Sequence, residues 1–168
     1  MDQHQQNFSA VIDTPCPALR LGIHTTDDAL ETIEFLPAKT DTQPASNSFT
    51  QNITDQLCAY FKDARALFDI DITTSGTPYQ QQVWQALRDI PAGNTLQYGE
   101  LAKQLSSSAR AIGNACRANP TPIITPCHRI VAANGLGGFS GQTSHSAKQD
   151  KLIIKRWLIN HEHAISRH

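Results

Sequence analysis

Long apolar runs are absent from this sequence. None of its stretches approaches the ~20 consecutive apolar residues that a transmembrane helix needs. The opening residues, MDQHQQNFSA, also lack the charged and apolar regions of a secretory signal peptide. Together these absences predict a cytoplasmic protein that makes no contact with a membrane.

Cysteine is scarce as well, and no two cysteines form a C-x-x-C pair. A disulfide framework of the kind found in short secreted domains is therefore not expected. A zinc site that includes Cys16 and His24 is an alternative, although their spacing matches no recognised zinc motif. We expect neither a metal nor an organic cofactor. The four cysteines are Cys16, Cys58, Cys116 and Cys127.

A large excess of one charge is missing from the whole chain, whose formal net charge is −1, but the two halves differ. Residues 1–75 hold eleven acidic and four basic side chains, whereas residues 76–168 hold four acidic and ten basic ones. A basic half beside an acidic half suggests that the second half binds nucleic acid. The alternative is that these cations are scattered over a solvated surface.

The patterns of the first 75 residues predict a small α/β unit. A loose tail is expected at its start, followed by two strands that alternate apolar and polar residues. A helical spacing and one more strand come after them. No candidate catalytic residue stands out in this unit. The expected segments are the tail 1–16, strands at 18–23, 29–36 and 68–72, a loop at 37–50 and a helix at 50–68.

A second domain, residues 76–168, is expected to begin after Thr74-Ser75-Gly76. Thr77 and Pro78 combine an N-cap residue with proline at the first helical position, which predicts a helix over 78–89.

Two short helices are predicted over 98–105 and 109–118, separated by the serine-rich turn 106–108. This arrangement is typical of a helix-turn-helix. The second helix consists mostly of small residues. It either approaches a nucleic-acid groove closely or packs tightly in the core, and the pattern does not separate these two interpretations.

The last predicted helix starts within 143–146 and ends near Asn160. Its amphipathic pattern predicts that apolar residues face inward and cations face outward. The inward set is Leu152, Ile153, Trp157 and Leu158, and the outward set is Lys148, Lys151, Lys155 and Arg156.

Between these helices lies Pro126-Cys127-His128-Arg129-Ile130, a thiol beside an imidazole and a guanidinium. A free thiol has a pKa of about 8.5, and a nearby cation or base increases its thiolate fraction. His128 and Arg129 are the local candidates for these roles. The alternative is that Cys127 is a small buried apolar residue, because free cysteine is among the residue types most often buried. Adjacent side chains of a strand also point to opposite faces, so neighbouring positions alone do not make Cys127 and His128 a catalytic pair.

Several further segments accompany this pentapeptide in a fixed order. They are Pro91–Thr95, Tyr98–Ala102, Ala109–Gly113, Arg117–Pro120, Pro122, Gly137–Gly141 and Trp157–Glu162. This set resembles the O6-alkylguanine-DNA alkyltransferases, also called methylated-DNA–protein-cysteine methyltransferases, over about Thr77 to Glu162. The resemblance implies an α+β fold. A ribonuclease H-like N-terminal domain (1–75) would precede a mostly helical domain (76–168) with a helix-turn-helix of winged-helix type.

For the reaction, the resemblance implies irreversible, stoichiometric transfer of an alkyl group from O6 of a flipped-out guanine to Cys127. O4-alkylthymine is an alternative substrate. His128, acting through a water, and Glu162 would withdraw the thiol proton. Asn119 would shape their hydrogen bonds, and Tyr98 would assist flipping and donate a hydrogen bond toward the base.

For binding, the resemblance implies a monomer on double-stranded DNA, with the second helix of the pair in the minor groove. Arg110 would fill the gap left by the flipped base. The DNA contacts would come from Tyr98, Ala109, Arg110, Ala111, Gly113, Arg117 and Ser140, and the base pocket from Pro122, Phe139 and Ser140.

The sequence departs from the family pattern at two positions. Phe139 stands where some members have tyrosine, so it keeps a stacking face and loses a hydroxyl donor. Gln97 stands where a serine N-cap is frequent, which predicts a weaker start for the helix at 98.

Two functions of other classes also fit part of this evidence. One is a protein that binds alkyl lesions without transfer, which Cys127 argues against because such relatives lack this cysteine. The other is a transcriptional regulator whose helix pair reads sequence in the major groove.

Overall fold

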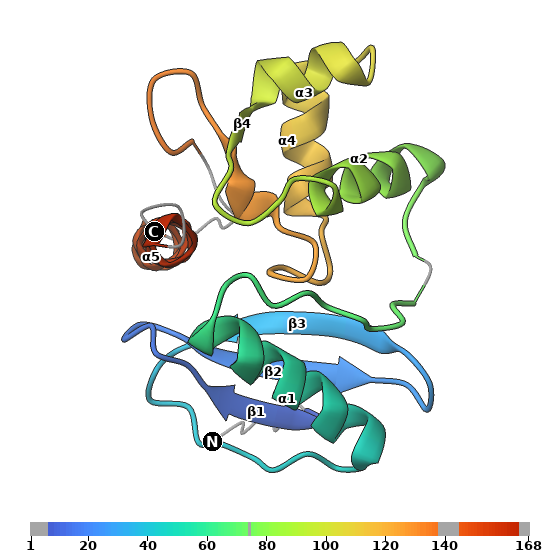
Figure 1. Ribbon diagram of the computed structural model, residues 1–168, viewed down its shortest axis with the longest axis vertical. Coiled ribbons are helices and arrows are strands. Elements are labelled where there is room, and N and C mark those ends of the chain that lie inside the picture. The colour runs from blue at the N-terminus through green and yellow to red at the C-terminus, as the bar shows by residue number, and fades with distance from the viewer. Residues whose placement is uncertain (1–6, 74, 138–144, 165–168) are drawn as a thin grey trace.

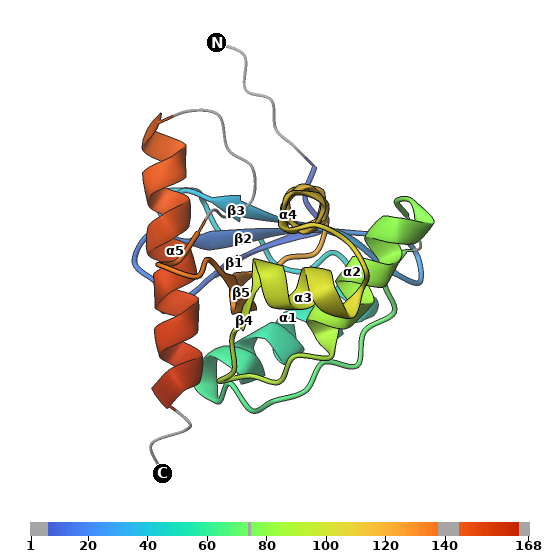
Figure 2. The same cartoon turned by 90° about the horizontal axis from the view of Figure 1, so that it is seen from above.

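Two groups of secondary structure make up the molecule, and the last helix lies beside both (Figure 1). The computed structural model describes residues 7–73, 75–137 and 145–164. Helix α5 (His145–His163) runs along one side of the molecule (Figure 2), and Figure 1 shows it at the level where the two groups meet. The chain is therefore α+β, as expected. Within the described ranges, no helix is long and apolar enough to cross a membrane.

The first group is a three-stranded antiparallel sheet, in the order β1-β2-β3, packed against helix α1 (Ser48–Lys62). The predicted hairpin is confirmed, because Leu21 pairs with Phe35 and Ile23 with Ile33 across its two strands. Leu21 and Ile23 are fully buried in the same cluster as the apolar face of α1. The strands are β1 (Ala10–Asp13), β2 (Arg20–Thr25) and β3 (Leu30–Leu36).

Three predictions for this half were wrong. Part of the expected tail, Ala10–Asp13, is strand β1, because pairing with β2 buries Ala10 and Val11. Helix α1 ends at Lys62, since Asp63 takes an extended conformation. The apolar alternation at 68–72 yields only one isolated bridge, from Ile72 to Leu30, and no strand.

The helices of the second group agree closely with their sequence signals. Helix α2 (Pro78–Arg88) starts with a capping box, in which Thr77 and Gln80 each satisfy the other's backbone N–H. Helix α3 (Tyr98–Gln104) follows the N-cap residue Gln97, whose side chain makes no capping hydrogen bond. Helix α4 (Ala109–Arg117) is capped by Ser108, whose hydroxyl accepts from the N–H of Ala111.

A short parallel pair of strands connects α3 to the cysteine-containing segment. Strand β4 (Leu96–Gln97) pairs with β5 (Ile130–Val131), with Leu96 opposite Ile130. Tyr98 directly follows β4 and Arg129 directly precedes β5. This pairing therefore brings the start of the helix-turn-helix beside the predicted reactive segment.

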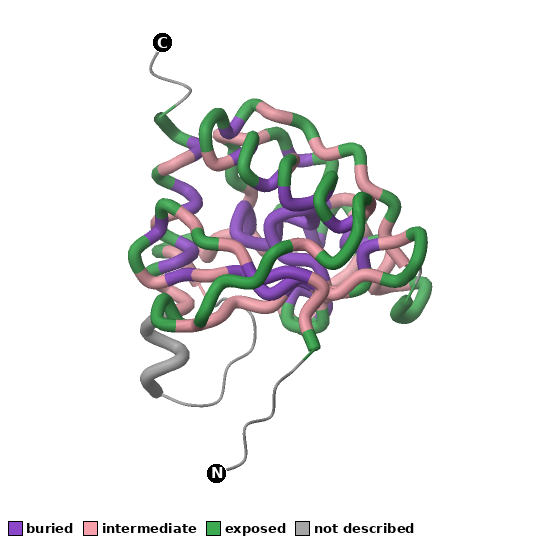
Figure 3. Tube along the Cα trace, turned by 90° about the horizontal axis from the view of Figure 1, so that it is seen from below, coloured by how far each residue is buried: buried purple, intermediate pink, exposed green. Residues whose placement is uncertain are grey.

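The core of the first group is completed by residues from the second half of the chain. Ile123, Ile124, Ile154 and Leu158 are buried in the same cluster as the sheet and α1. Ile123 has a φ of 77°, a strained conformation for a β-branched residue, which its burial helps to maintain. Figure 3 shows that the buried residues gather in the middle of the molecule. The two groups are thus interlocked through shared packing.

Candidate active site

Cys127 begins a tight 3₁₀ turn, Cys127–Arg129, rather than a strand. Every residue from Thr121 to Ile130 is buried, and Cys127 itself is 2% exposed. Because the turn does not alternate between two faces, the thiol, the imidazole of His128 and the guanidinium of Arg129 are all enclosed. The strand argument against a functional Cys-His pair therefore does not apply here.

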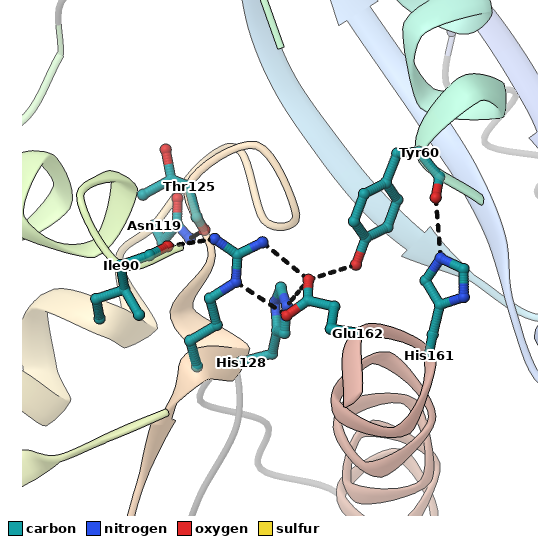
Figure 4. A network of polar contacts seen from close by, with 8 residues as sticks. Tyr60, Ile90, Asn119, Thr125, His128, His161 and Glu162 are labelled. Atoms are coloured by element: carbon teal, nitrogen blue, oxygen red, sulfur yellow. Dashed lines mark hydrogen bonds and ion pairs between the residues drawn. The ribbon is translucent and has the colours of Figure 1, made fainter. Parts of the chain in front are cut away.

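The carboxylate of Glu162, near the end of α5, is the centre of a buried polar network (Figure 4). Its Oε2 accepts hydrogen bonds from His128 Nε2 at 2.8 Å and from Arg129 Nη2 at 2.9 Å. Its Oε1 accepts from Arg129 Nε at 2.9 Å. Arg129 also donates to the backbone carbonyl of Ile90. Arg129, one of the two local candidates for acting on the thiol, is thus committed to Glu162 and Ile90.

The protonation states of this network follow from its hydrogen bonds. Burial alone would raise the pKa of Glu162, but hydrogen bonds from His128 and Arg129 outweigh burial and hold the pKa well below its usual range. Burial lowers the pKa of His128, so the imidazole is neutral at pH 7. An ionised carboxylate only accepts, so Nε2 carries the proton of His128 and Nδ1 keeps a lone pair. Nδ1 is buried, has no hydrogen-bond partner among the described residues, and is able to act as a base.

The thiol of Cys127 is buried in surroundings that partly favour its ionised form. Burial raises the pKa of Cys127, while a hydrogen bond from Asn119 and the charge of Lys155 lower it. Asn119 is itself fixed, because its amide nitrogen donates to the carbonyl of Thr125 at 2.8 Å and its amide oxygen accepts from the N–H of Thr121 at 3.0 Å. Asn119 and Lys155 therefore partly offset the effect of burial on the pKa of the thiol.

Lys155 is a residue whose position the sequence prediction got wrong. It was expected to face solvent, yet it is fully buried, and its Nζ lies 5.8 Å from the ring centroid of Tyr98. Burial lowers the pKa of Lys155 to about 8. Ile153, expected inside, is 54% exposed, while Ile154 is buried. The error arises because α5 packs on two sides, with Ile154 against the first core and Lys155 toward Cys127, so one amphipathic stripe does not describe the helix.

Tyr98 lies at the start of α3, on the same side of the molecule as Cys127 and Lys155. Burial raises the pKa of Tyr98 to about 12, so its hydroxyl remains protonated and able to donate a hydrogen bond at neutral pH. Gly137 contacts its ring so closely that a Cβ at position 137 would lie 2.9 Å from Cε2 of Tyr98. Gly137 also has a φ of 74°, so glycine suits this position on both grounds.

Helix α4 divides its small residues between the core and the surface. Ile112, Ala115 and Cys116 are buried in the second core. On the other face, a Cβ added at Gly113 would meet no atom within 4 Å. The remaining predicted DNA contacts of α4 are Ala109, Arg110 and Arg117, which are exposed, and Ala111, which is half-buried.

This chain is similar to known proteins over most of its length. The family described as "6-O-methylguanine DNA methyltransferase, DNA binding domain" matches residues 78–164, which is more than half of the chain. The methylated-DNA–protein-cysteine methyltransferase of Mycobacterium tuberculosis is 40% identical over 138 residues, covering 77% of this chain and 82% of that protein. The chain belongs to this methyltransferase family.

Two further members show the extent of the likeness. The Salmonella typhimurium methylated-DNA–protein-cysteine methyltransferase is 43% identical over 114 residues, which cover 66% of this chain and 61% of that relative. The crystal structure of Mycobacterium tuberculosis OGT in complex with DNA superimposes with a TM-score of 0.72 and 34% identity, covering 92% of this chain and 91% of that one.

The structure brings most of the sequence-predicted methyltransferase site together. Cys127, His128, Asn119 and Glu162 are joined by the network around the turn. Pro122 lies within the buried stretch at 121–130. Phe139 and Ser140 lie outside the described residues.

Two further features bear on ligand binding near the site. A groove of about 680 Å³ is lined by Pro126 and Arg129, but Cys127 is not among its lining residues. Among the residues that the structure describes, no group of three or more His, Cys, Asp or Glu side chains is placed to bind a metal, and Cys16 is buried in the first core.

Proposed function

We propose that this protein repairs DNA by transferring a methyl or other small alkyl group from O6 of guanine to Sγ of Cys127. One observation carries the proposal: the thiol of Cys127, the imidazole of His128 and the carboxylate of Glu162 are all buried. His128 Nε2 is hydrogen-bonded to Glu162 Oε2 at 2.8 Å. Membership of the methyltransferase family supports the same reaction.

In the proposed reaction, the thiol proton passes to Nδ1 of His128, through a bridging water. The thiolate then attacks the alkyl carbon, the carbon–O6 bond breaks, and its electron pair stays on the guanine oxygen. Tyr98 stabilises the leaving purine by donating a hydrogen bond. A thioether is a poor leaving group, so each molecule acts once. O4-alkylthymine would react by the same steps.

A base inside a duplex hides its O6 atom, so the nucleotide has to leave the stack at a cost of a few kcal/mol. We assign the DNA contact to the exposed face of α4. The side chain of Arg110 would fill the gap, and Ala109, Ala111 and Gly113 would allow the helix to approach the minor groove. Arg117 would bind phosphate. Phe139, Ser140 and Pro122 are proposed to enclose the flipped base.

We extend the proposal to the architecture and setting of the molecule. Residues 1–75 would form a ribonuclease H-like domain, and residues 76–168 a domain whose helix pair is of winged-helix type. Helices α3 and α4, which lie on either side of a short turn, support the second assignment. We propose that the protein acts in the cytoplasm as a monomer on double-stranded DNA.

The proposal is tested by incubating the protein with duplex DNA that contains one O6-methylguanine. We expect the protein to gain the mass of one methyl group, located on the peptide that contains Cys127. The Cys127→Ala variant should show no gain in mass and should still bind DNA. Lesion binding without a mass change would favour the non-catalytic lesion binder, and sequence-specific binding without a lesion would favour the transcriptional regulator.

A further inference from the structure

Tyr60, on helix α1 of the first half, contacts the catalytic network of the second half. Its hydroxyl lies 2.7 Å from Oε2 of Glu162, although the two residues are 102 positions apart in the sequence. Tyr60 is fully buried and Glu162 is 2% exposed. The contact joins the α1 group to the carboxylate that orients His128 (Figure 4).

The hydrogen bond has a defined direction. Burial and the charge of Glu162 raise the pKa of Tyr60 above its usual range, so its hydroxyl stays protonated. Because Glu162 is ionised, the hydroxyl of Tyr60 donates and Oε2 accepts. The same oxygen accepts from His128 Nε2 and Arg129 Nη2, so three donors converge on it.

A second contact holds the backbone of Tyr60 in place. His161 Nε2 lies 2.9 Å from the carbonyl oxygen of Tyr60, which only accepts, so His161 donates. The ring of His161 stacks on Trp157, with centroids 5.0 Å apart and planes 16° apart. Two consecutive residues of α5, His161 and Glu162, therefore attach to Tyr60 through its backbone and its side chain.

We propose that Tyr60 is a positioning residue for alkyl transfer, which holds the Glu162 carboxylate against His128 so that the lone pair of Nδ1 is directed for proton removal. The inference rests on the proposed function and extends it into the first half of the chain. The Tyr60 hydroxyl supplies the donor from α1, while Arg129 supplies the donors from the cysteine-containing turn.

The experiment compares Tyr60→Phe with the unaltered protein in single-turnover methyl transfer from pH 5 to 9. Phenylalanine keeps the packing and removes one donor from Oε2. With one donor fewer, the Glu162 carboxylate stabilises protonated His128 more strongly and so raises the pKa of His128. The charges of Arg129 and Lys155 oppose this rise. We expect the acidic limb of the rate profile to move up by about one pH unit, which makes transfer roughly tenfold slower on that limb.

Tyr79→Phe is the matched control, because it also removes a tyrosine hydroxyl. That hydroxyl forms a hydrogen bond of 2.5 Å with Ser107 Oγ and does not bind Glu162. Its profile should coincide with that of the unaltered protein, and DNA affinity should be unchanged in both variants. An unshifted profile for Tyr60→Phe, whether at full rate or uniformly slowed, would overturn the positioning role. If the unaltered protein gains no methyl group on Cys127, the proposed function fails first and this inference fails with it.

Discussion

Two residues on one side of α5 affect the Cys127 thiol in different ways. Glu162 acts indirectly, because it orients His128. Lys155 acts through its charge, which lowers the pKa of Cys127. The two residues are seven positions apart, or about two helical turns, so they lie on the same side of the helix. In the proposed reaction, the buried cation would stabilise the thiolate, and the buried carboxylate would assist removal of its proton.

Lys155→Met should slow transfer at neutral pH. Loss of the cation raises the pKa of Cys127, so less thiolate is present, and we expect a rate about tenfold lower at pH 7. The difference should narrow as pH rises, because the unaltered Lys155 itself loses its charge above its pKa of about 8. Single-turnover rates across this pH range measure the effect. The control is Arg156→Met, which removes an exposed cation from the same helix; equal rates for both variants would contradict the assigned role.

The same substitution should stabilise the fold. Burial lowers the pKa of Lys155 from 10.5 to about 8, so below pH 8 the folded state holds a cation at a cost of roughly 3 kcal/mol. This cost falls between pH 8 and 10.5, where only the unfolded state is protonated, and is absent above that range. Urea unfolding should therefore show Lys155→Met to be more stable at pH 7, with the gap closing by pH 10. A variant that is less stable at pH 7 would refute this account.

At the residue scale, the sequence was informative for residues that lie in recognisable family motifs. Cys127, His128, Asn119 and Glu162 follow from the family resemblance, and the structure places them together. Tyr60 was not predicted, because its partner is 102 positions away and no local pattern marks such a contact.

At the scale of elements, helix α4 presents an open position in the middle of its exposed face. Gly113 has no atom within 4 Å of the place where a Cβ would stand. A side chain there would fit the isolated protein and would be close to any molecule bound against this face. The isolated chain therefore leaves room for a side chain at this position of α4.

Two substitutions at Gly113 separate folding from DNA binding. Gly113→Ala should stabilise the protein by about 0.5–1 kcal/mol, because alanine favours a helix more than glycine, and should bind DNA normally. Gly113→Gln should fold and show a similar stability in unfolding assays. It should nevertheless bind duplex DNA about tenfold more weakly, because its longer side chain holds α4 away from the groove. Fluorescence anisotropy measures the affinity. Unchanged binding by Gly113→Gln would remove this face of α4 from the DNA interface.

Elements with strong end signals were predicted best. The capping residues Thr77 and Ser108 correctly indicated the starts of α2 and α4. Short strands were predicted poorly, because their existence depends on a partner strand. Strand β1 needs β2, and the apolar alternation at 68–72 has no full partner.

At the scale of the whole molecule, the two groups of elements share their packing. Ile123, Ile124, Ile154 and Leu158 come from the second half and complete the core of the first. The N–H of Ile33 in β3 also donates to the carbonyl of Pro120 at 2.9 Å. The sequence predicted two domains divided at 75/76, but no local pattern predicts which distant residues complete a core.

This packing predicts one unfolding transition for both halves. Trp84 is buried in the second core and Trp157 packs against the first. Variants that keep one tryptophan each, Trp84→Phe and Trp157→Phe, report on the two cores separately by fluorescence. Each variant has its own stability, so each tryptophan signal is compared with far-ultraviolet circular dichroism of the same variant. We expect the midpoints in urea to coincide within each variant, and separated midpoints would show independently folding halves.

The shared core also limits how this protein can be recombined with its relatives. A chimera that takes residues 1–75 from another family member would place a foreign sheet against Ile123, Ile124, Ile154 and Leu158. It would also put the relative's own residue in the place of Tyr60, whose hydroxyl donates to Glu162 in this chain. Exchange of the first half alone should therefore yield weakly folded, slow-reacting hybrids, and grafting these four positions together with that half should restore both properties.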